Sequence, residues 1–220
     1  IIDKAIEKSG GDNYEKASIE FSFRKGIYTS ERNGGLYKFT RSKKDSAGVE
    51  IKDVLNNDGF KRFRDGKEVQ LPDSLATSYA ESVNSVHYFV QLPYGLNSPA
   101  VLKKLKGEDE IKGKKYYEIE VTFQQEGGGS DHEDIYMYWV NKKDFTVDYM
   151  AYRFFVNDGG IRFRVAVNPR VEKGIRFVDY ENYKTDKLDT PLEKLDDLYE
   201  KGQLKKVSEI RNRILKVEIN

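Results

Sequence analysis

Alternation of hydrophobic and polar residues is the most regular pattern in this sequence, and it predicts antiparallel β-strands. Apolar side chains occupy every second position from 17 to 23, which is the period of a strand with one buried face. Similar runs, separated by turns such as Asn57-Asp58-Gly59, predict further strands at 26–31, 36–41, 49–55 and 60–64. A second, longer group of strands is predicted at 116–123, 134–140, 145–156, 160–168, 174–183 and within 206–219.

Helical spacing of apolar residues appears in a few short segments. Ile2, Ala5 and Ile6 predict a short N-terminal helix that ends at Gly10. The longer segments with this spacing, or with a typical helix start, predict helices at 74–91, 99–105 and 191–201. Because no linker separates the two groups of strands, we predict one α+β domain that spans 1–220.

Two of the predicted strands are apolar on both faces. In 135–140 and in 147–156, large side chains occupy consecutive positions, so both sides of the sheet need a cover. Leaving one such side chain in water forgoes roughly 1.5–3 kcal/mol of burial. One cover is the ordinary core, and we expect the other to be the helix 74–91, with or without a bound ligand.

Composition narrows the function classes. The 220 residues include 38 Lys and Arg against 37 Asp and Glu, and a net charge of +1 disfavours a dedicated nucleic-acid binder. The absence of cysteine excludes disulfides and thiolate metal sites, whereas 13% aromatic residues argue for a folded chain. The sequence starts at Ile1 without a methionine, so we expect an upstream segment, such as a signal peptide, to have been removed.

The densest polar cluster is His132, Glu133 and Asp134, which follows a run of glycines. These residues, with His87, are candidates for acid–base chemistry. A zinc site would need at least one more ligand at a suitable spacing, and phosphate-binding and nucleophile motifs are missing, so we expect no metal and no cofactor. The favoured interpretation is that His132 is a turn residue and that His87 is a hydrogen-bonded histidine at a helix–sheet interface.

Several motifs resemble an uncharacterised family, a domain of unknown function found in predicted lipoproteins of Gram-negative envelopes. The segments that carry this resemblance are Asn84-Ser85-Val86-His87-Tyr88-Phe89, Leu92-Pro93-Tyr94-Gly95-Leu96-Asn97, 128–134, Tyr138-Trp139, Arg162-Phe163-Arg164 and Gly174-Ile175-Arg176-Phe177. The resemblance implies an envelope location, in the periplasm or at the outer membrane, with a lipidated cysteine upstream of Ile1 as the only membrane attachment.

The order of elements is also similar to the LolA-like fold. That resemblance implies a strongly curved antiparallel sheet, or half-barrel, with a short N-terminal helix and with helices covering its concave face. LolA-like proteins carry acyl chains between sheet and helices, which implies an apolar cavity. The residues expected to line it are Tyr79, Tyr88, Phe89, Tyr138, Trp139, Tyr152 and Phe154.

Three hypotheses follow from these observations. The first is a non-enzymatic envelope lipoprotein that binds an apolar or amphipathic small molecule, such as a lipid, between the sheet and the helices 74–91 and 99–105. The second is an enzyme that uses His132, Glu133, Asp134 and His87. The third is a structural or interaction module that presents an aromatic sheet face. The sequence favours the first and leaves the oligomeric state open.

Overall fold

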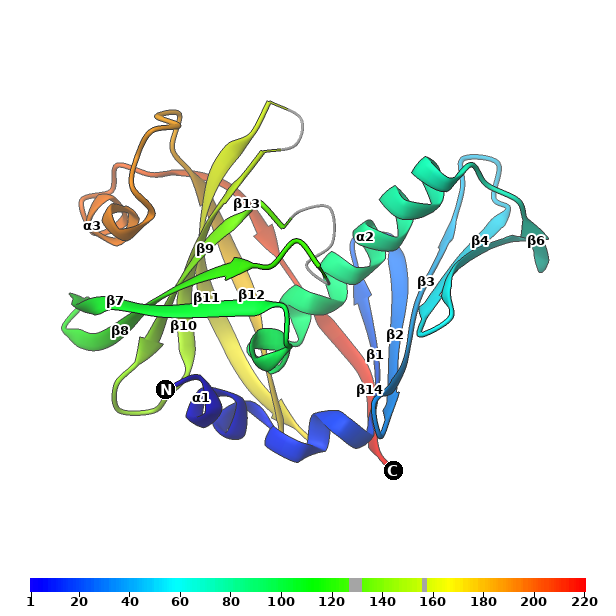
Figure 1. Ribbon diagram of the computed structural model, residues 1–220, viewed down its shortest axis with the longest axis horizontal. Helices are drawn as coiled ribbons and strands as arrows, with labels where there is room; N and C mark the ends of the chain where they lie inside the picture. The colour runs from blue at the N-terminus through cyan, green and yellow to red at the C-terminus, as the bar shows by residue number, and fades with distance from the viewer. Residues whose placement is uncertain (127–131, 156–157) are drawn as a thin grey trace. The chain divides into compact units, whose positions relative to one another are not determined.

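The computed structural model of the protein describes residues 1–126, 132–155 and 158–220 (Figure 1). These residues form two compact units that alternate along the chain, and each is described by itself. Unit 1 comprises Ile1–Ser9, Pro93–Pro169 and Val178–Ile210, and unit 2 comprises Gly10–Leu92, Arg170–Phe177 and Arg211–Asn220.

Unit 2 contains a seven-stranded antiparallel sheet. The described strands lie in the order β14-β1-β2-β3-β4-β5-β6. Their bounds are β1 Ala17–Phe23, β2 Gly26–Asn33, β3 Leu36–Lys44, β4 Glu50–Asn56, β5 Gly59–Arg64, β6 Lys67–Val69 and β14 Arg213–Ile219. Each consecutive pair from β1 to β6 is a hairpin, as the turn signals predicted. The chain enters this sheet through the 3-10 helix η1, Gly11–Lys16.

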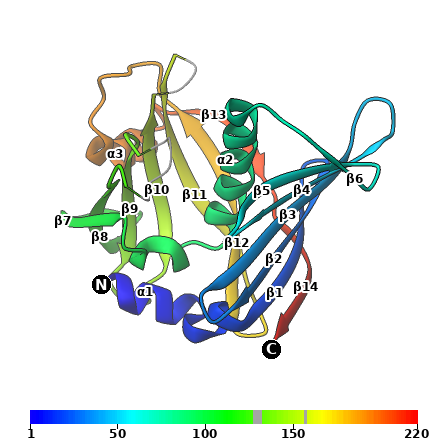
Figure 2. The same ribbon diagram turned by 45° about the vertical axis from the view of Figure 1, so that its right-hand side comes forward.

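The long helix of unit 2, α2, lies on one face of this sheet (Figure 2). It spans Asp73–Val90, which confirms the predicted helix 74–91. Its inward positions Val83, His87 and Val90 are buried, and the helix contacts β3, β4 and β5. The helical spacing of apolar residues therefore corresponds to the buried face in the second half of the helix, whereas Leu75 near its start is exposed.

A second seven-stranded antiparallel sheet lies mainly in unit 1. Its described strands have the order β13-β12-β11-β10-β9-β8-β7. Their bounds are β7 Val101–Ile111, β8 Lys114–Phe123, β9 Ile135–Asn141, β10 Val147–Phe154, β11 Gly160–Glu172, β12 Ile175–Lys184 and β13 Lys205–Ile210. The tip of the β11–β12 hairpin, Arg170–Phe177, is the part of this sheet that belongs to unit 2.

The core of unit 1 lies between this sheet and a short helical segment near the C-terminus. The segment consists of the 3-10 helix η3, Leu192–Lys194, and α3, Leu195–Glu200. The buried core residues are Ile111, Tyr116, Met137, Trp139, Tyr149, Ala151, Ile161, Phe163, Val165, Leu192, Leu195 and Leu204. The N-terminal helix α1, Ile2–Ser9, contacts the 3-10 helix η2, Tyr94–Asn97, where Asn97 donates a hydrogen bond to Asp3 at 2.7 Å.

The predicted helix at 99–105 is wrong, because this segment begins strand β7. The Val101 amide donates to the Ser98 carbonyl, which closes a turn rather than a helix, and the Gln124 amide donates to the Ala100 carbonyl. From Val101 on, β7 pairs with β8 through its whole length. Pairing with a strand that follows in the sequence overrides the local Ser98-Pro99 signal.

The predicted α+β class with antiparallel strands is confirmed, but the strands form two sheets rather than one curved sheet. The strong curvature and the single domain stay predictions. Residues 127–131, which include the run of glycines before His132, and position 156 of the predicted strand 145–156 lie outside the described residues. Within the described ranges, no helix is long and apolar enough to cross a membrane.

Candidate functional site

The second face of the β9–β10 pair carries a row of aromatic rings in contact with one another in unit 1. Cross-strand pairing puts Tyr152 opposite Tyr136, with ring centroids 5.3 Å apart, and Tyr138 follows at 6.1 Å with parallel planes. Phe123 from β8 and Phe154 from β10 continue the row at 5.7 Å and 6.0 Å. We call these five residues the aromatic ladder. Tyr136 and Tyr138 are buried, whereas the other three are half-buried.

Two arginines from β11 lie along this ladder. The Arg164 guanidinium donates a hydrogen bond to the Tyr152 hydroxyl at 2.8 Å and lies 5.1 Å from the centre of that ring. The Arg162 guanidinium lies 5.1 Å from the Phe154 ring. Such contacts combine a cation with a π-system, so this end of the ladder offers both positive charge and apolar surface.

The opposite face of the same strands belongs to the core of unit 1. Trp139 is fully buried there and packs on Phe163, with ring centroids 5.5 Å apart. The structure therefore brings Tyr138, Tyr152 and Phe154 of the predicted ligand-binding set together, but it places Trp139 on the other side of the sheet. The sequence pattern of two double-sided strands had indicated this division of faces.

The other three predicted ligand-binding residues lie on α2 in unit 2. The Arg62 guanidinium stacks 3.5 Å from the centre of the Tyr79 ring. Tyr88 and Phe89 are half-buried and contact each other edge to face, with centroids 5.4 Å apart. Their proposed part in a ligand cavity stays a prediction.

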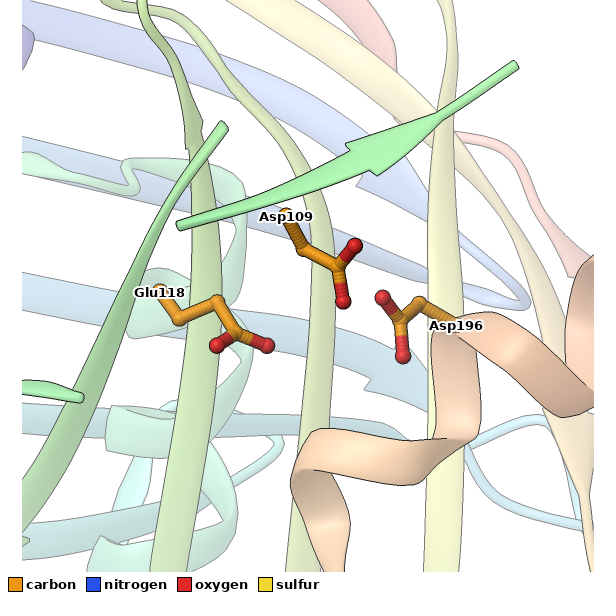
Figure 3. Close-up of side chains that lie close together, drawn as sticks. All are labelled: Asp109, Glu118 and Asp196. Carbon is orange, nitrogen blue, oxygen red and sulfur yellow. The ribbon is translucent and has the colours of Figure 1, made fainter. Parts of the chain in front are cut away.

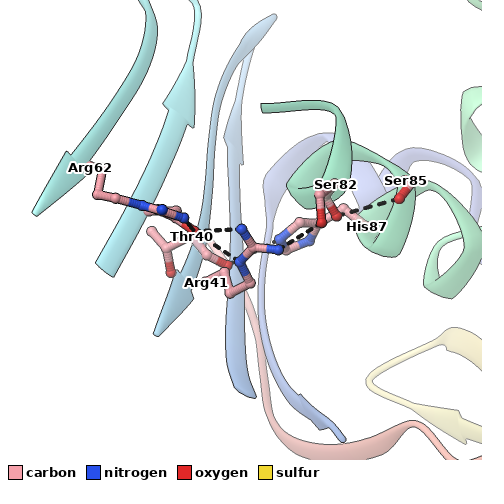
Figure 4. A network of polar contacts seen from close by, with 7 residues as sticks. Thr40, Arg41, Arg62, Ser82, Ser85 and His87 are labelled. Carbon is pink, nitrogen blue, oxygen red and sulfur yellow. Dashed lines mark hydrogen bonds and ion pairs between the residues drawn. The ribbon is translucent and has the colours of Figure 1, made fainter. Parts of the chain in front are cut away.

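A polar network lies between α2 and its sheet in unit 2 (Figure 4). Register places Arg41, Asp53 and Arg62 side by side on β3, β4 and β5. Both arginines donate two hydrogen bonds to the fully buried Asp53 carboxylate, at 2.6–3.0 Å, and Arg41 also donates to the Ser82 hydroxyl at 2.7 Å. The network satisfies a buried charge and joins the helix to the sheet.

His87 is a buried, hydrogen-bonded histidine, as expected. Its Nε2 lies 3.2 Å from the Thr40 carbonyl oxygen, and its ring stacks on Phe39 with centroids 4.4 Å apart. Burial lowers the pKa of His87 to about 3, and the charge of Arg32 acts in the same direction, so the imidazole is neutral at physiological pH. Its Nε2–H then donates to the carbonyl.

The polar residues 132–134 directly precede strand β9 in unit 1. His132 is half-buried, Glu133 is exposed, and Asp134 is buried and accepts a hydrogen bond from the Tyr136 hydroxyl at 3.5 Å. Asp134 thus lies near Tyr136, two positions further along the chain, as residues on one side of an extended segment do. An enzymatic role of His132, Glu133, Asp134 and His87 stays a prediction, as does the interaction-module hypothesis.

None of the patterns noted in the sequence singled out three carboxyl groups that the structure brings together in unit 1. Asp109 on β7, Glu118 on β8 and Asp196 on α3 each direct an oxygen into one small region, and these oxygens lie within 4.8 Å of one another. Figure 3 shows the three side chains pointing toward one another. We call them the carboxylate triad. Glu118 and Asp196 are buried, and Asp109 is half-buried.

The triad is electrostatically strained. Burial, together with the neighbouring Asp109 and Glu118, raises the pKa of Asp196 to about 7. Burial likewise raises the pKa of Glu118 above its usual value, Asp109 adds to this effect, and the Trp139 indole N–H opposes it. Like charges at this distance disfavour simultaneous ionisation of all members.

The two antiparallel sheets and the order of elements define a protein of the LolA fold. The chain is similar to the crystal structure of a LolA superfamily protein from Nitrosomonas europaea, with a TM-score of 0.51 and 11% identity over 98% of this chain and 92% of that chain. The chain belongs to DUF6503, a family of unknown function whose model matches residues 1–212. Both resemblances drawn from the sequence, the uncharacterised family and the LolA-like architecture, are thereby confirmed.

Two further solved structures are similar at a lower level. A DUF1329 family protein from Desulfovibrio piger gives a TM-score of 0.48 at 12% identity, covering 100% of this chain and 91% of that chain. A putative outer membrane lipoprotein-sorting protein domain from Vibrio parahaemolyticus gives 0.48 at 7% identity, covering 99% and 91%. No curated protein is a recognisable sequence relative of the chain.

Proposed function

We propose that the protein is a non-enzymatic envelope lipoprotein that binds an apolar or amphipathic ligand, such as a lipid acyl chain, against the aromatic ladder. The observation that carries this proposal is the ladder itself, a continuous aromatic row on the sheet face opposite the core of unit 1. The LolA fold supports it, because the LolA-like resemblance implies carriage of acyl chains against such a sheet.

The chemistry of the ladder also suggests how a ligand would be oriented. Stacked rings offer apolar surface for a hydrocarbon chain, and each buried methylene contributes about 0.8 kcal/mol. Arg162 lies at the half-buried end beside Phe154, where its guanidinium can bind a carboxylate or phosphate headgroup, whereas the buried Arg164 donates to the Tyr152 hydroxyl. An anionic lipid therefore fits this surface better than a neutral hydrocarbon.

A displacement assay tests the proposal. The protein is titrated with cis-parinaric acid, a fluorescent fatty acid, which is then displaced with palmitate. The informative variants are Tyr152→Glu, which puts a negative charge into the ladder, and Tyr152→Leu, which keeps it apolar. Tyr37→Glu is the matched control, because Tyr37 is a half-buried strand tyrosine outside the ladder.

We expect the wild type, Tyr152→Leu and Tyr37→Glu to bind the probe, and Tyr152→Glu to lose about tenfold or more in affinity. The proposal would be wrong if the wild type showed no saturable binding, or if Tyr152→Glu bound the probe as tightly as the wild type. The lipoprotein part is tested separately by labelling the full-length native protein with an alkyne fatty acid and fractionating the cells. Absence of label, or recovery outside the envelope fraction, would contradict it.

A further inference from the structure

The carboxylate triad is not explained by ligand binding at the aromatic ladder, because it lies on the other face of the sheet. Asp109 and Glu118 share the core face of the β7–β8 hairpin, and Asp196 approaches them from α3. We propose that Asp109, Glu118 and Asp196 bind one hard divalent cation of the calcium class.

Unpartnered buried atoms point into the triad. Glu118 Oε1 and Asp196 Oδ1 are buried and accept no hydrogen bond of normal geometry from the described residues, although the Trp139 indole N–H lies near enough to Glu118 to stabilise its charge. Glu118 and Asp196 are 8% and 2% exposed, so bulk water does not reach them freely. Buried polar atoms without partners are rare, which marks a place where a ligand would complete the structure.

A shared proton does not satisfy all three groups. Protonation of one acid supplies a single donor, which can bridge only two of the three carboxyl groups. No ion pair with Lys or Arg is made by the triad within the described ranges, so the charge that stays after such sharing has no counter-ion from these side chains. A cation would coordinate all three carboxylates at once and neutralise their mutual repulsion.

The charged groups around the triad leave it negative. The positive charge of Lys194 on η3 stabilises the ionised form of Glu118, whereas the negative charge of Glu193 destabilises it. On the sheet side, the Glu110 amide donates to Asp109 Oδ1 at 2.7 Å, which holds that carboxylate in place. The Asp197 amide likewise interacts with Asp196. These backbone donors orient Asp109 and Asp196 but do not neutralise the triad. Its remaining negative charge would be neutralised by the cation.

The number and kind of ligands indicate the size of the ion. The triad oxygens lie within 4.8 Å of one another, close enough for all three to reach one Ca²⁺ ion. Mg²⁺ usually keeps several waters and is held by one or two carboxylates, so a site of three carboxylates favours the larger ion. Three carboxylates and no soft ligand also favour Ca²⁺ over zinc or copper.

Gly107 keeps the space for Glu118. A β-bulge interrupts the β7–β8 register between Leu105 and Gly107, so that residue 107 lies opposite Glu118. A Cβ atom at position 107 would lie 3.2 Å from Glu118 Oε2, which is tighter than ordinary contact. The half-buried Asp109 marks the side from which an ion and its remaining water ligands would enter.

Terbium luminescence tests the proposal, because Trp139 is the only tryptophan and adjoins Glu118. The protein is freed of metal with EDTA, titrated with Tb³⁺ and excited through the indole, and the emission is then competed with Ca²⁺ or Mg²⁺. Asp196→Asn and Glu118→Gln each remove one charged ligand at constant shape. Asp197→Asn, one residue further on α3 and exposed, is the matched control.

We expect sensitised emission from the wild type and from Asp197→Asn, displaced by Ca²⁺ more readily than by Mg²⁺. Asp196→Asn and Glu118→Gln should lose on the order of tenfold or more in affinity. In parallel, Ca²⁺ should raise the thermal unfolding midpoint of the wild type and of the control but not of the two variants.

Both triad variants remove like-charge repulsion, so they are expected to fold in EDTA. Absence of sensitised emission in the wild type would overturn the proposal, as would equal Tb³⁺ affinity in Asp196→Asn and the wild type. A Ca²⁺-independent unfolding midpoint in the wild type would do the same. These outcomes are independent of the lipid-binding assay.

Discussion

At the scale of single residues, the charge of Asp53 is indispensable to unit 2. Its carboxylate is fully buried and receives hydrogen bonds from Arg41 and Arg62. Asp53→Asn leaves the buried Arg41 and the half-buried Arg62 without a counter-charge, so we expect a loss of about 3–5 kcal/mol in the free energy of unfolding, measured in urea. Asp58→Asn, in an exposed turn, should change it by less than about 0.5 kcal/mol. Similar losses for the two variants would contradict the prediction.

His87 gives unit 2 a dependence of stability on pH. Its pKa is about 3 in the folded protein and about 6.5 in the unfolded chain, so the unfolded state binds the extra proton between these values. His87 therefore does not lower the free energy of unfolding above about pH 6.5. Below that pH the free energy of unfolding decreases as the pH falls toward 3. At about pH 4.5 the loss should be about 2–3 kcal/mol.

Comparison with His87→Phe isolates this effect from the carboxyl groups. The variant keeps an aromatic ring against Phe39 but cannot titrate. Arg32, the charged group that acts on the imidazole, is unchanged. Urea unfolding at several pH values should show a shallower decrease for the variant below about pH 6.5. Parallel profiles for the two proteins would show that His87 does not contribute.

At the scale of elements, β7 is an exposed edge strand protected by lysines. It ends the order of strands in its sheet, and Leu102 and Leu105 on it are exposed. Lys104→Val combined with Lys106→Val removes the charges that oppose edge-to-edge pairing, so we expect self-association, seen by light scattering. Lys43→Val with Lys52→Val, on the internal strands β3 and β4, removes the same charge. This double variant should keep the state of association of the wild type. Equal association of both double variants would contradict this.

The same strand shows where sequence patterns stop being informative. Periodicity alone located α2 and the two double-sided strands, because their side chains are sorted by the element itself. The segment 99–105 has an equally good helix start, but its pairing with β8 decides its structure. That pairing depends on residues about twenty positions further on, which a local pattern does not contain.

The carboxylate triad follows the same logic. Once β7 and β8 are seen as a hairpin with a turn at Lys112-Gly113, alternation places Asp109 and Glu118 on one face. A correct strand assignment would thus have predicted two of the three residues. Asp196 joins them only through the packing of α3 on β7, and no spacing among 37 acidic residues singles it out.

At the scale of the whole molecule, the path of the chain bears on the single-domain prediction. The chain passes between units after residues 9, 92, 169, 177 and 210, so neither unit is a continuous segment. The hairpin β11–β12 also extends from unit 1 into unit 2. Unfolding one unit would release strands that the other unit needs, so we expect one cooperative unfolding transition.

Val83→Ala tests this coupling, because it weakens unit 2 alone. Val83 is fully buried on α2, and its truncation should cost about 2 kcal/mol. Trp139, the only tryptophan, reports on unit 1 by fluorescence, while circular dichroism reports on both units. If the units unfold together, the Trp139 transition of the variant shifts to lower urea by as much as the dichroism transition. A Trp139 transition that stays at its wild-type midpoint would show two independently folding units, and the single-domain prediction would then be wrong.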